Sequence, residues 1–85
     1  MDPSRLNASL KQAERLLNTA SLHDAEAIYR EILNEVPGQP KASQGLGLIA
    51  LHTGNASAAV ELLQTAAISL PNDPSINTQL GLAFG

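Results

Sequence analysis

The chain of 85 residues contains no cysteine and no tryptophan, and its only aromatic side chains are Tyr29 and Phe84. The absence of cysteine excludes a disulfide framework, a zinc–thiolate centre and a thiol nucleophile. So few aromatic residues disfavour the stacking of nucleic-acid bases. Five basic residues stand against eight acidic ones, for a net charge of −3. The chain thus lacks the basic footprint of a nucleic-acid-binding domain, and we expect no nucleic-acid partner.

Long apolar segments are also missing. The longest run of apolar residues and glycine, Gly45 to Leu51, has seven residues, whereas a membrane-spanning helix needs about 20. The first residues, MDPSRLNASLK, are polar and do not resemble a secretion signal. We therefore expect a cytoplasmic location without membrane association.

Charged residues are unevenly distributed along the chain. All five basic residues lie in the first 41 positions, and residues 42–85 carry only two charged side chains, Glu61 and Asp73. Such a charge-poor second half has two explanations. It is either an interior segment covered by neighbours on both sides, which we favour, or a surface for self-association.

Prolines and glycines divide the chain into five segments with helical spacing of apolar residues. The predicted helices are residues 3–19, 22–36, 40–53, 56–69 and 74–84. Asp2-Pro3 and Asp73-Pro74 each combine an N-cap residue with a proline suited to the first helical position. Ser21 followed by Asp24 resembles a capping box. No segment alternates apolar and polar residues, so the predicted fold class is all-α without a strand.

The sequence aligns with itself when it is shifted by 34 residues. Breakers, small residues and apolar residues all fall into register. The aligned pairs include Pro37 with Pro71, Pro40 with Pro74, Ala25 with Ala59, and Leu46-Gly47-Leu48 with Leu80-Gly81-Leu82.

In this pattern the chain resembles the tetratricopeptide repeat family, whose unit is a helix pair of about 34 residues. The resemblance implies a superhelix of antiparallel helix pairs, about 2.5 repeats long. Within one domain, 1–85, the expected units are residues 6–39, 40–73 and a partial repeat, 74–85. Small residues are expected at the helix contacts, namely Ala13, Gly47 and Gly81 on the first helices and Ala25 and Ala59 on the second. Tyr29 and Leu63 are expected to fill the gap toward the next repeat.

The resemblance also implies a function, the binding of a peptide or partner protein in the concave groove of the superhelix. By register, the candidate groove residues are Asn7, Leu10, Glu14, Leu17, Asn18, Lys41, Gln44, Leu48, Leu51, His52, Ser75, Thr78 and Leu82. Family members that bind chaperones hold a peptide carboxylate in a clamp of Lys, Asn and Arg. Only Lys41 matches that clamp, because Leu10, Glu14 and Gly45 occupy other clamp positions. We do not expect this mode of binding.

An enzyme is not expected. Gly45-x-Gly47-x-x-Ala50 fits a loose dinucleotide-binding pattern, but that pattern needs a preceding strand, and here Pro40 already opens a helix. His23 and His52 stand alone, without the spacing of a metal site. The sequence therefore predicts no catalytic residue, no cofactor and no metal.

A second function class stays open, a structural or self-assembly appendage at the N-terminus of a larger protein. The run Leu46 to Gly54 is similar to repeats that precede glycosyltransferase, methyltransferase or sulfotransferase domains in bacterial proteins. The last predicted helix offers apolar residues without any charge after Asp73, namely Ile76, Leu80, Ala83 and Phe84. Part of this set is expected to pack back on the second repeat and the rest to form an open end. Either the chain is a fragment of a longer protein, or a second copy covers this end in a homodimer.

Overall fold

The computed structural model describes residues 2–84, with the backbone alone for residue 84, and these residues form five α-helices. The helices are α1 (Pro3–Asn18), α2 (Leu22–Glu35), α3 (Pro40–His52), α4 (Ala56–Ser69) and α5 (Pro74–Phe84). Each boundary lies within one residue of the predicted one. No strand occurs in this part of the chain, so the prediction of an all-α fold is confirmed.

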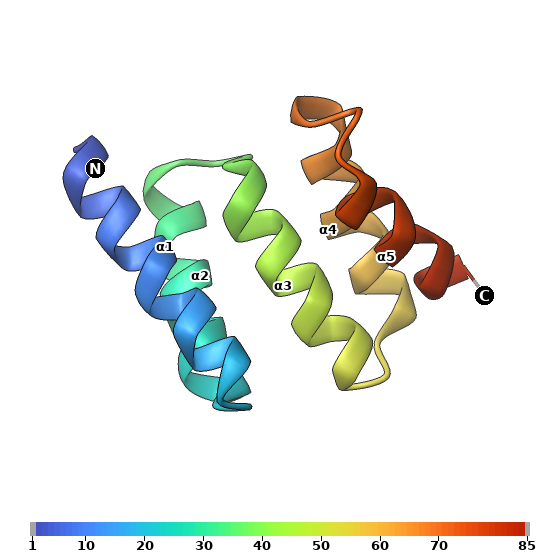
Figure 1. The fold of residues 1–85 in the computed structure, drawn as a ribbon, viewed down its shortest axis with the longest axis horizontal. Helices are drawn as coiled ribbons and strands as arrows, with labels where there is room; N and C mark the ends of the chain where they lie inside the picture. The colour runs from blue at the N-terminus through green and yellow to red at the C-terminus, as the bar shows by residue number, and fades with distance from the viewer. Residues whose placement is uncertain (1, 85) are drawn as a thin grey trace.

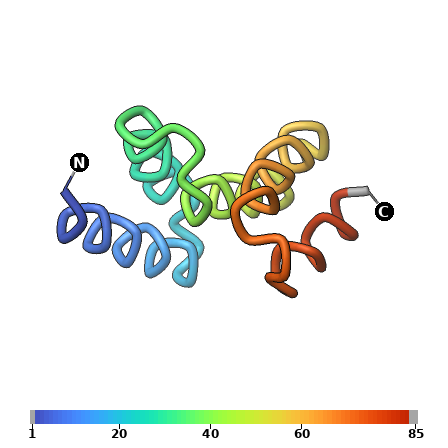
Figure 2. Tube along the Cα trace, turned by 90° about the horizontal axis from the view of Figure 1, so that it is seen from above, coloured from blue at the N-terminus to red at the C-terminus, as the bar shows by residue number. Residues whose placement is uncertain are grey.

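The helices form two layers, with α1, α3 and α5 in one and α2 and α4 in the other (Figures 1 and 2). The chain reverses direction at every turn, so consecutive helices are antiparallel (Figure 1). Each helix packs against the next one along the chain, and α3 also contacts α1 and α5. The stack measures 36 × 26 × 20 Å. In this arrangement α3 is the central helix of its layer.

Two helices begin with the same side-chain cap. The Asp2 carboxylate accepts hydrogen bonds from the backbone N–H of Ser4 and Arg5 at 2.8 and 3.1 Å. Asp73 accepts from Ser75 and Ile76 at 2.9 and 3.3 Å. These bonds satisfy N–H groups that have no partner inside the helix. The predicted starts at Asp2-Pro3 and Asp73-Pro74 are confirmed.

The predicted capping box at Ser21 is wrong, because the Ser21 side chain makes no cap hydrogen bond. At the corresponding start of α4, Asn55 accepts from the N–H of Ala58 at 3.3 Å. Both residues have ψ values of 63° to 78°, outside the extended range usual for an N-cap. We attribute the difference between these two helix starts to side-chain length, since the amide oxygen of asparagine lies one bond further from the backbone than the hydroxyl oxygen of serine.

Helices α1 and α3 end in the same left-handed turn. Ser21 donates its backbone N–H to Leu16 O, and Asn55 donates to Ala50 O, each at 2.8 Å. In this turn a backbone N–H bonds to the carbonyl oxygen five residues earlier, and the residue just before the donor has a positive φ. That residue is Gly54 (φ 80°) after α3 but Ala20 (φ 62°) after α1. Alanine is strained in this conformation because its Cβ crowds the backbone.

The core lies between the layers and contains the small residues that the repeat pattern predicts there. Ala13, Ala25 and Ala59 are all fully buried. A Cβ at Gly47 would lie 2.8 Å from Cγ of Leu63, so the missing side chain lets α3 approach α4. The burial of these small residues agrees with the positions that the repeat pattern predicts for them.

The open end of the stack agrees in part with expectation. Ile76 is fully buried, and Leu80 and Ala83 pack against the cluster of Ala50, Ala59 and Leu63. A Cβ at Gly81 would meet no atom within 4 Å, and no helix follows α5 among the described residues, so the expected close helix contact at this glycine stays a prediction. The expected packing of Phe84 concerns a side chain that lies outside them.

Candidate functional site

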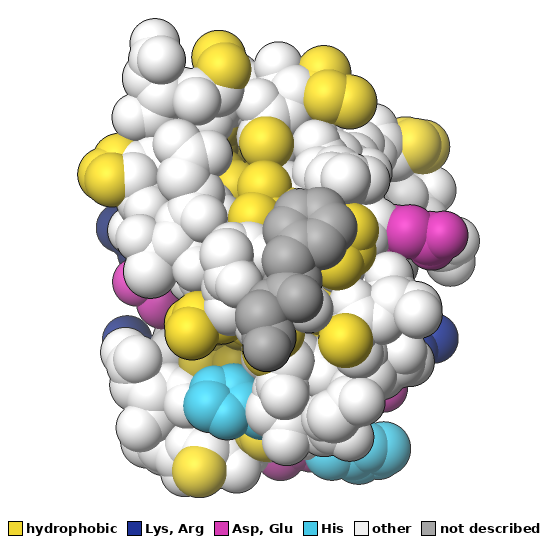
Figure 3. All heavy atoms as spheres, turned by 90° about the vertical axis from the view of Figure 1, so that its right-hand side faces the viewer, with side chains coloured by type: hydrophobic (Ala, Val, Ile, Leu, Met, Phe, Trp, Pro, Cys, Tyr) yellow, Lys and Arg dark blue, Asp and Glu magenta, His cyan; other side chains and the backbone are white. Residues whose placement is uncertain are grey.

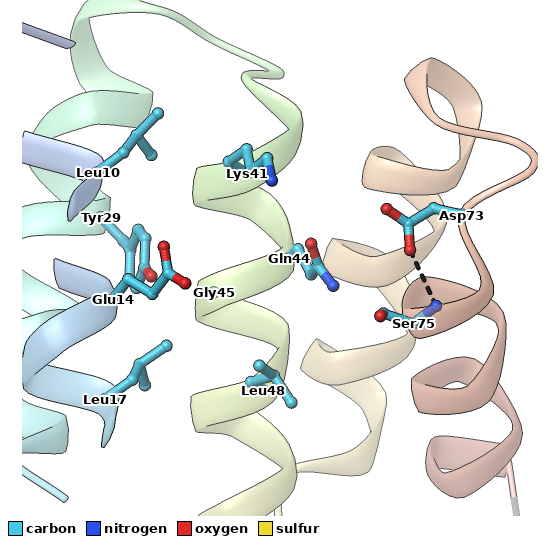
Figure 4. Close-up of a pocket in the computed structure, with 10 residues that line it drawn as sticks. All are labelled: Leu10, Glu14, Leu17, Tyr29, Lys41, Gln44, Gly45, Leu48, Asp73 and Ser75. Carbon is cyan, nitrogen blue, oxygen red and sulfur yellow. Dashed lines mark hydrogen bonds between the residues drawn. The ribbon is translucent and has the colours of Figure 1, made fainter. Parts of the chain in front are cut away.

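A pocket of about 240 Å³ opens between α1, α3 and the start of α5 (Figure 4). Three of its residues come from α1, four from α3 and one from α2, and the last two lie at the start of α5. They are Leu10, Glu14, Leu17, Tyr29, Lys41, Gln44, Gly45, Leu48, Asp73 and Ser75. The pocket therefore lies in the layer from which the register predicts the groove.

The structure divides the predicted groove residues into two sets. Those that line the pocket are Leu10, Glu14, Leu17, Lys41, Gln44, Leu48 and Ser75. Those that do not line it are Asn7, Asn18, Leu51, His52, Thr78 and Leu82. Leu51 is half-buried against the cluster of Ala50, Ala59 and Leu63, whereas the other five are exposed. The pocket thus covers the part of the predicted groove between residues 10–17 of α1 and residues 41–48 of α3.

Three pocket residues, Tyr29, Gly45 and Asp73, are not among the predicted groove residues, and of these Tyr29 belongs to the opposite layer. The Tyr29 ring fills the space beside Gly45, where a Cβ would lie 2.7 Å from Cε1 and closer still to Cζ. Cζ carries the hydroxyl group, which therefore emerges past Gly45 into the pocket (Figure 4). Helix α2 thus contributes a polar group to the face formed by α1 and α3.

The Tyr29 hydroxyl stays protonated at neutral pH. Burial, and to a smaller extent the negative charge of Glu14, together raise its pKa from 10.0 to about 12. Both causes disfavour the phenolate, since it would be poorly solvated and close to a carboxylate. The hydroxyl is therefore available both as a donor and as an acceptor of hydrogen bonds.

Glu14 and Lys41 bring opposite charges to the pocket without being paired to each other. Within residues 2–84 the ion pairs join Arg5 to Glu31 at 3.8 Å and Arg30 to Glu26 at 3.4 Å. Both side chains of the pocket are exposed. They can form ion pairs with a bound molecule without first breaking an ion pair of the protein.

The wall toward α5 is held by two polar contacts. Gln44 Nε2 donates to Gln79 Oε1 at 3.1 Å, which joins α3 to α5. Asp73 is occupied as the cap of α5 (Figure 4). These contacts hold this wall, and Glu14, Lys41, the Tyr29 hydroxyl and the Ser75 hydroxyl are polar groups of the pocket that can meet a ligand.

Other kinds of site find no support in the described part of the chain. It contains no group of three His, Asp or Glu side chains that could hold a metal ion. The glycines of the dinucleotide-like pattern lie inside α3 and contact Tyr29 and Leu63, so their role is in helix packing. None of the described helices is long and apolar enough to span a membrane.

Two layers of antiparallel helices, in which each pair packs on the next, define an α-helical repeat stack. A sequence model described as "Tetratricopeptide repeat" matches residues 21–80. The match covers well over half of the chain, which belongs to the tetratricopeptide repeat family. No curated protein and no solved structure gives a significant match. Repeats of this family are in general protein-interaction modules without catalytic activity.

Proposed function

We propose that this chain binds a peptide segment of a partner protein in the groove formed by α1, α3 and α5, centred on the pocket beside Gly45. The observation that carries the proposal is the pocket itself. It combines partly exposed leucines with groups of opposite charge that form no ion pair among the described side chains. Apolar surface combined with a few polar groups that fix orientation is the usual composition of a binding site.

The leucines supply the apolar contact area. Leu10 and Leu17 lie on α1 and Leu48 lies on α3, and all three are half-buried (Figure 4). Apolar area removed from water contributes about 25 cal/mol per Å². A peptide that covers these side chains therefore gains binding energy before any polar contact forms.

The charges of the pocket disfavour a partner that ends in a free carboxylate. Among the described residues that line it, Lys41 is the only cation, against the carboxylates of Glu14 and Asp73. A carboxylate bound here would face two like charges. The groove thus suits an internal segment of the partner, bound in extended or helical form.

A peptide-display screen tests the proposal, with matched variants of the chain. We expect peptides that bind the unaltered chain to bind Lys41→Glu at least several-fold more weakly. Lys11→Glu makes the same change on an exposed residue of α1 outside the pocket, and its affinity is expected to be unchanged. If Lys41→Glu and Lys11→Glu bind the peptides with the same affinity, or if no peptide binds the unaltered chain, the proposed groove function is wrong.

A second candidate function, an assembly appendage that joins two copies of the chain, is supported by the face of α5 around Gly81. A Cβ at Gly47 would meet Leu63 and the Ala59 carbonyl oxygen of α4, whereas a Cβ at the equivalent Gly81 would meet no atom within 4 Å. Viewed from this end, the surface is mostly apolar or uncharged, with charged side chains at its margins (Figure 3). A second copy could cover it in a two-fold symmetric dimer.

Light scattering over a range of concentrations tests this second candidate. Dimerisation through α5 predicts a mass that rises with concentration for the unaltered chain but not for Gly81→Glu. Ala27→Glu adds the same charge to an exposed position of α2 and should leave the mass unchanged. A monomer at every concentration contradicts the assembly function and leaves the groove proposal untouched.

A further inference from the structure

The hydroxyl of Tyr29 and the carboxylate of Glu14 lie side by side in the pocket, although they come from different layers of the fold (Figure 4). Tyr29 is 4% exposed, and its ring is held between α1 and α3 because Gly45 has no side chain. Its hydroxyl therefore occupies a fixed position. A fixed polar group loses little conformational entropy when it binds a ligand.

This part of the pocket is rich in hydrogen-bond acceptors. A carboxylate has two acceptor oxygens and a phenol has one. The Glu14 carboxylate has no cation within 4 Å among the described side chains. Its negative charge reaches Tyr29, because it contributes to the raised pKa of that hydroxyl. The site thus lacks a positively charged partner for the Glu14 carboxylate, which lies beside the Tyr29 hydroxyl.

The size and lining of the pocket define what would fill it. Its volume of about 240 Å³ is below the range of about 300–1,000 Å³ typical of sites that enclose whole small molecules, so one long side chain is a better match. Below Glu14 in Figure 4, Leu17 and Leu48 form an apolar wall. Lys41 lies one helical turn before Gly45, away from that wall (Figure 4).

We infer that Glu14 and Tyr29 form a subsite for a basic side chain, lysine or arginine, of the bound peptide. This inference rests on the proposed groove function. The methylene stem of the side chain lies against Leu17 and Leu48, as long cationic side chains do on apolar surface. Its N–H groups donate to the Glu14 carboxylate and to the phenol oxygen. Lys41 then faces an acceptor or an acidic group elsewhere on the peptide.

Competing occupants fit less well. An acidic side chain at the same place would be repelled by Glu14, and an apolar one would leave the carboxylate and the hydroxyl without partners as water is displaced. Arginine and lysine carry only donors on their head groups. They therefore match the acceptor oxygens of the Glu14 carboxylate and the Tyr29 hydroxyl.

The test is a positional-scanning library of peptides with acetylated and amidated ends, so that only side chains carry charge. We expect binders to require lysine or arginine at one position. Affinities of the best peptide, measured by fluorescence anisotropy, should fall about tenfold or more in Glu14→Gln, as for loss of a charge-assisted hydrogen bond. Tyr29→Phe, which keeps the ring, should weaken binding by about three- to tenfold. Glu61→Gln is the control, since Glu61 is exposed on α4 outside the pocket.

A second peptide with norleucine in place of the basic residue separates a direct contact from a structural effect. If Glu14 contacts the basic side chain, the norleucine peptide should bind Glu14→Gln with the same affinity as it binds the unaltered chain. Circular dichroism of each variant verifies that the helices remain.

The outcomes distinguish this inference from the proposed function on which it rests. Peptides that lose affinity in Lys41→Glu, but need no basic residue and ignore Glu14→Gln, would overturn the inference and keep the groove function. If no peptide binds, or if every groove variant binds as the unaltered chain does, both are overturned.

Discussion

The ring of Tyr29, on α2, occupies the space in which a side chain at residue 45, on α3, would have to stand. This single contact links the core to the candidate site. Gly45 lets α3 close over the ring, and the ring carries its hydroxyl through to the pocket. A change at either residue should therefore affect both stability and binding.

Gly45→Ala is expected to destabilise the chain. Overpacking costs about 1–3 kcal/mol, which exceeds the gain of up to about 1 kcal/mol from replacing a mid-helix glycine by alanine. The matched control is Gly81→Ala, whose new methyl group meets nothing within 4 Å and should be neutral or stabilising. Urea unfolding measures both, and equal effects of the two substitutions would contradict the Tyr29–Gly45 contact.

The left-handed turns that follow α1 and α3 provide a reciprocal test. Ala20→Gly should stabilise the chain by about 0.5–1 kcal/mol, because glycine adopts positive φ without strain and only part of the gain is lost to its greater freedom when unfolded. Gly54→Ala should destabilise it by about 1 kcal/mol. Melting temperatures that move in the same direction for both variants would be inconsistent with equivalent turns.

The buried alanines at the helix contacts should not tolerate a larger side chain. Ala25→Leu or Ala59→Leu is expected to cost about 1–3 kcal/mol, since both sites are fully buried. Ala27→Leu is the control because Ala27 is exposed on α2, and Glu14→Ala and Gln44→Ala should also cost far less. Thermal melts that rank these variants in the reverse order would show that the register is wrong.

Tyr29 is the only tyrosine, so the phenolate absorbance reports its ionisation without interference. Its titration in the folded chain should centre near pH 12. Because this pKa is raised above the ordinary value of 10.0, the neutral phenol favours the folded state. The contribution of Tyr29 to the unfolding free energy is constant below the ordinary pKa of 10.0 and falls as the pH rises from there toward 12.

Glu14→Gln should lower the pKa of Tyr29 but leave it above its ordinary value, since burial is the larger cause. Tyr29→Phe should remove the alkaline fall in stability that this group contributes. If the Tyr29 hydroxyl of the folded chain instead titrates near its ordinary pKa of 10.0, the fold does not shield this hydroxyl from water.

Most of the fold could be predicted from the sequence because its determinants are local. Pro3 and Pro74 mark helix starts, and the alignment of Ala25 with Ala59 sets the register between layers. The error at Ser21 arose because a capping pattern does not show whether a short side chain reaches the next N–H group.

The site was less predictable because the pocket depends on which side chains pass between the layers. The register assigns Tyr29 to packing between repeats, and nothing in its spacing shows that its hydroxyl enters the pocket. One signal was available. Gly45 aligns with Lys11 and Gln79 in the neighbouring repeats, so a glycine stands where this chain otherwise has a long side chain.

The central claim, that a partner binds at the pocket on α1 and α3, is tested most directly by site-specific photocrosslinking. A benzophenone amino acid would replace Gln44, which lines the pocket, or Gln64, which is exposed on α4 outside it. With a peptide selected against the unaltered chain, crosslinks are predicted from residue 44 and not from residue 64. Crosslinking from residue 64 alone, or equally from both positions, would contradict the account.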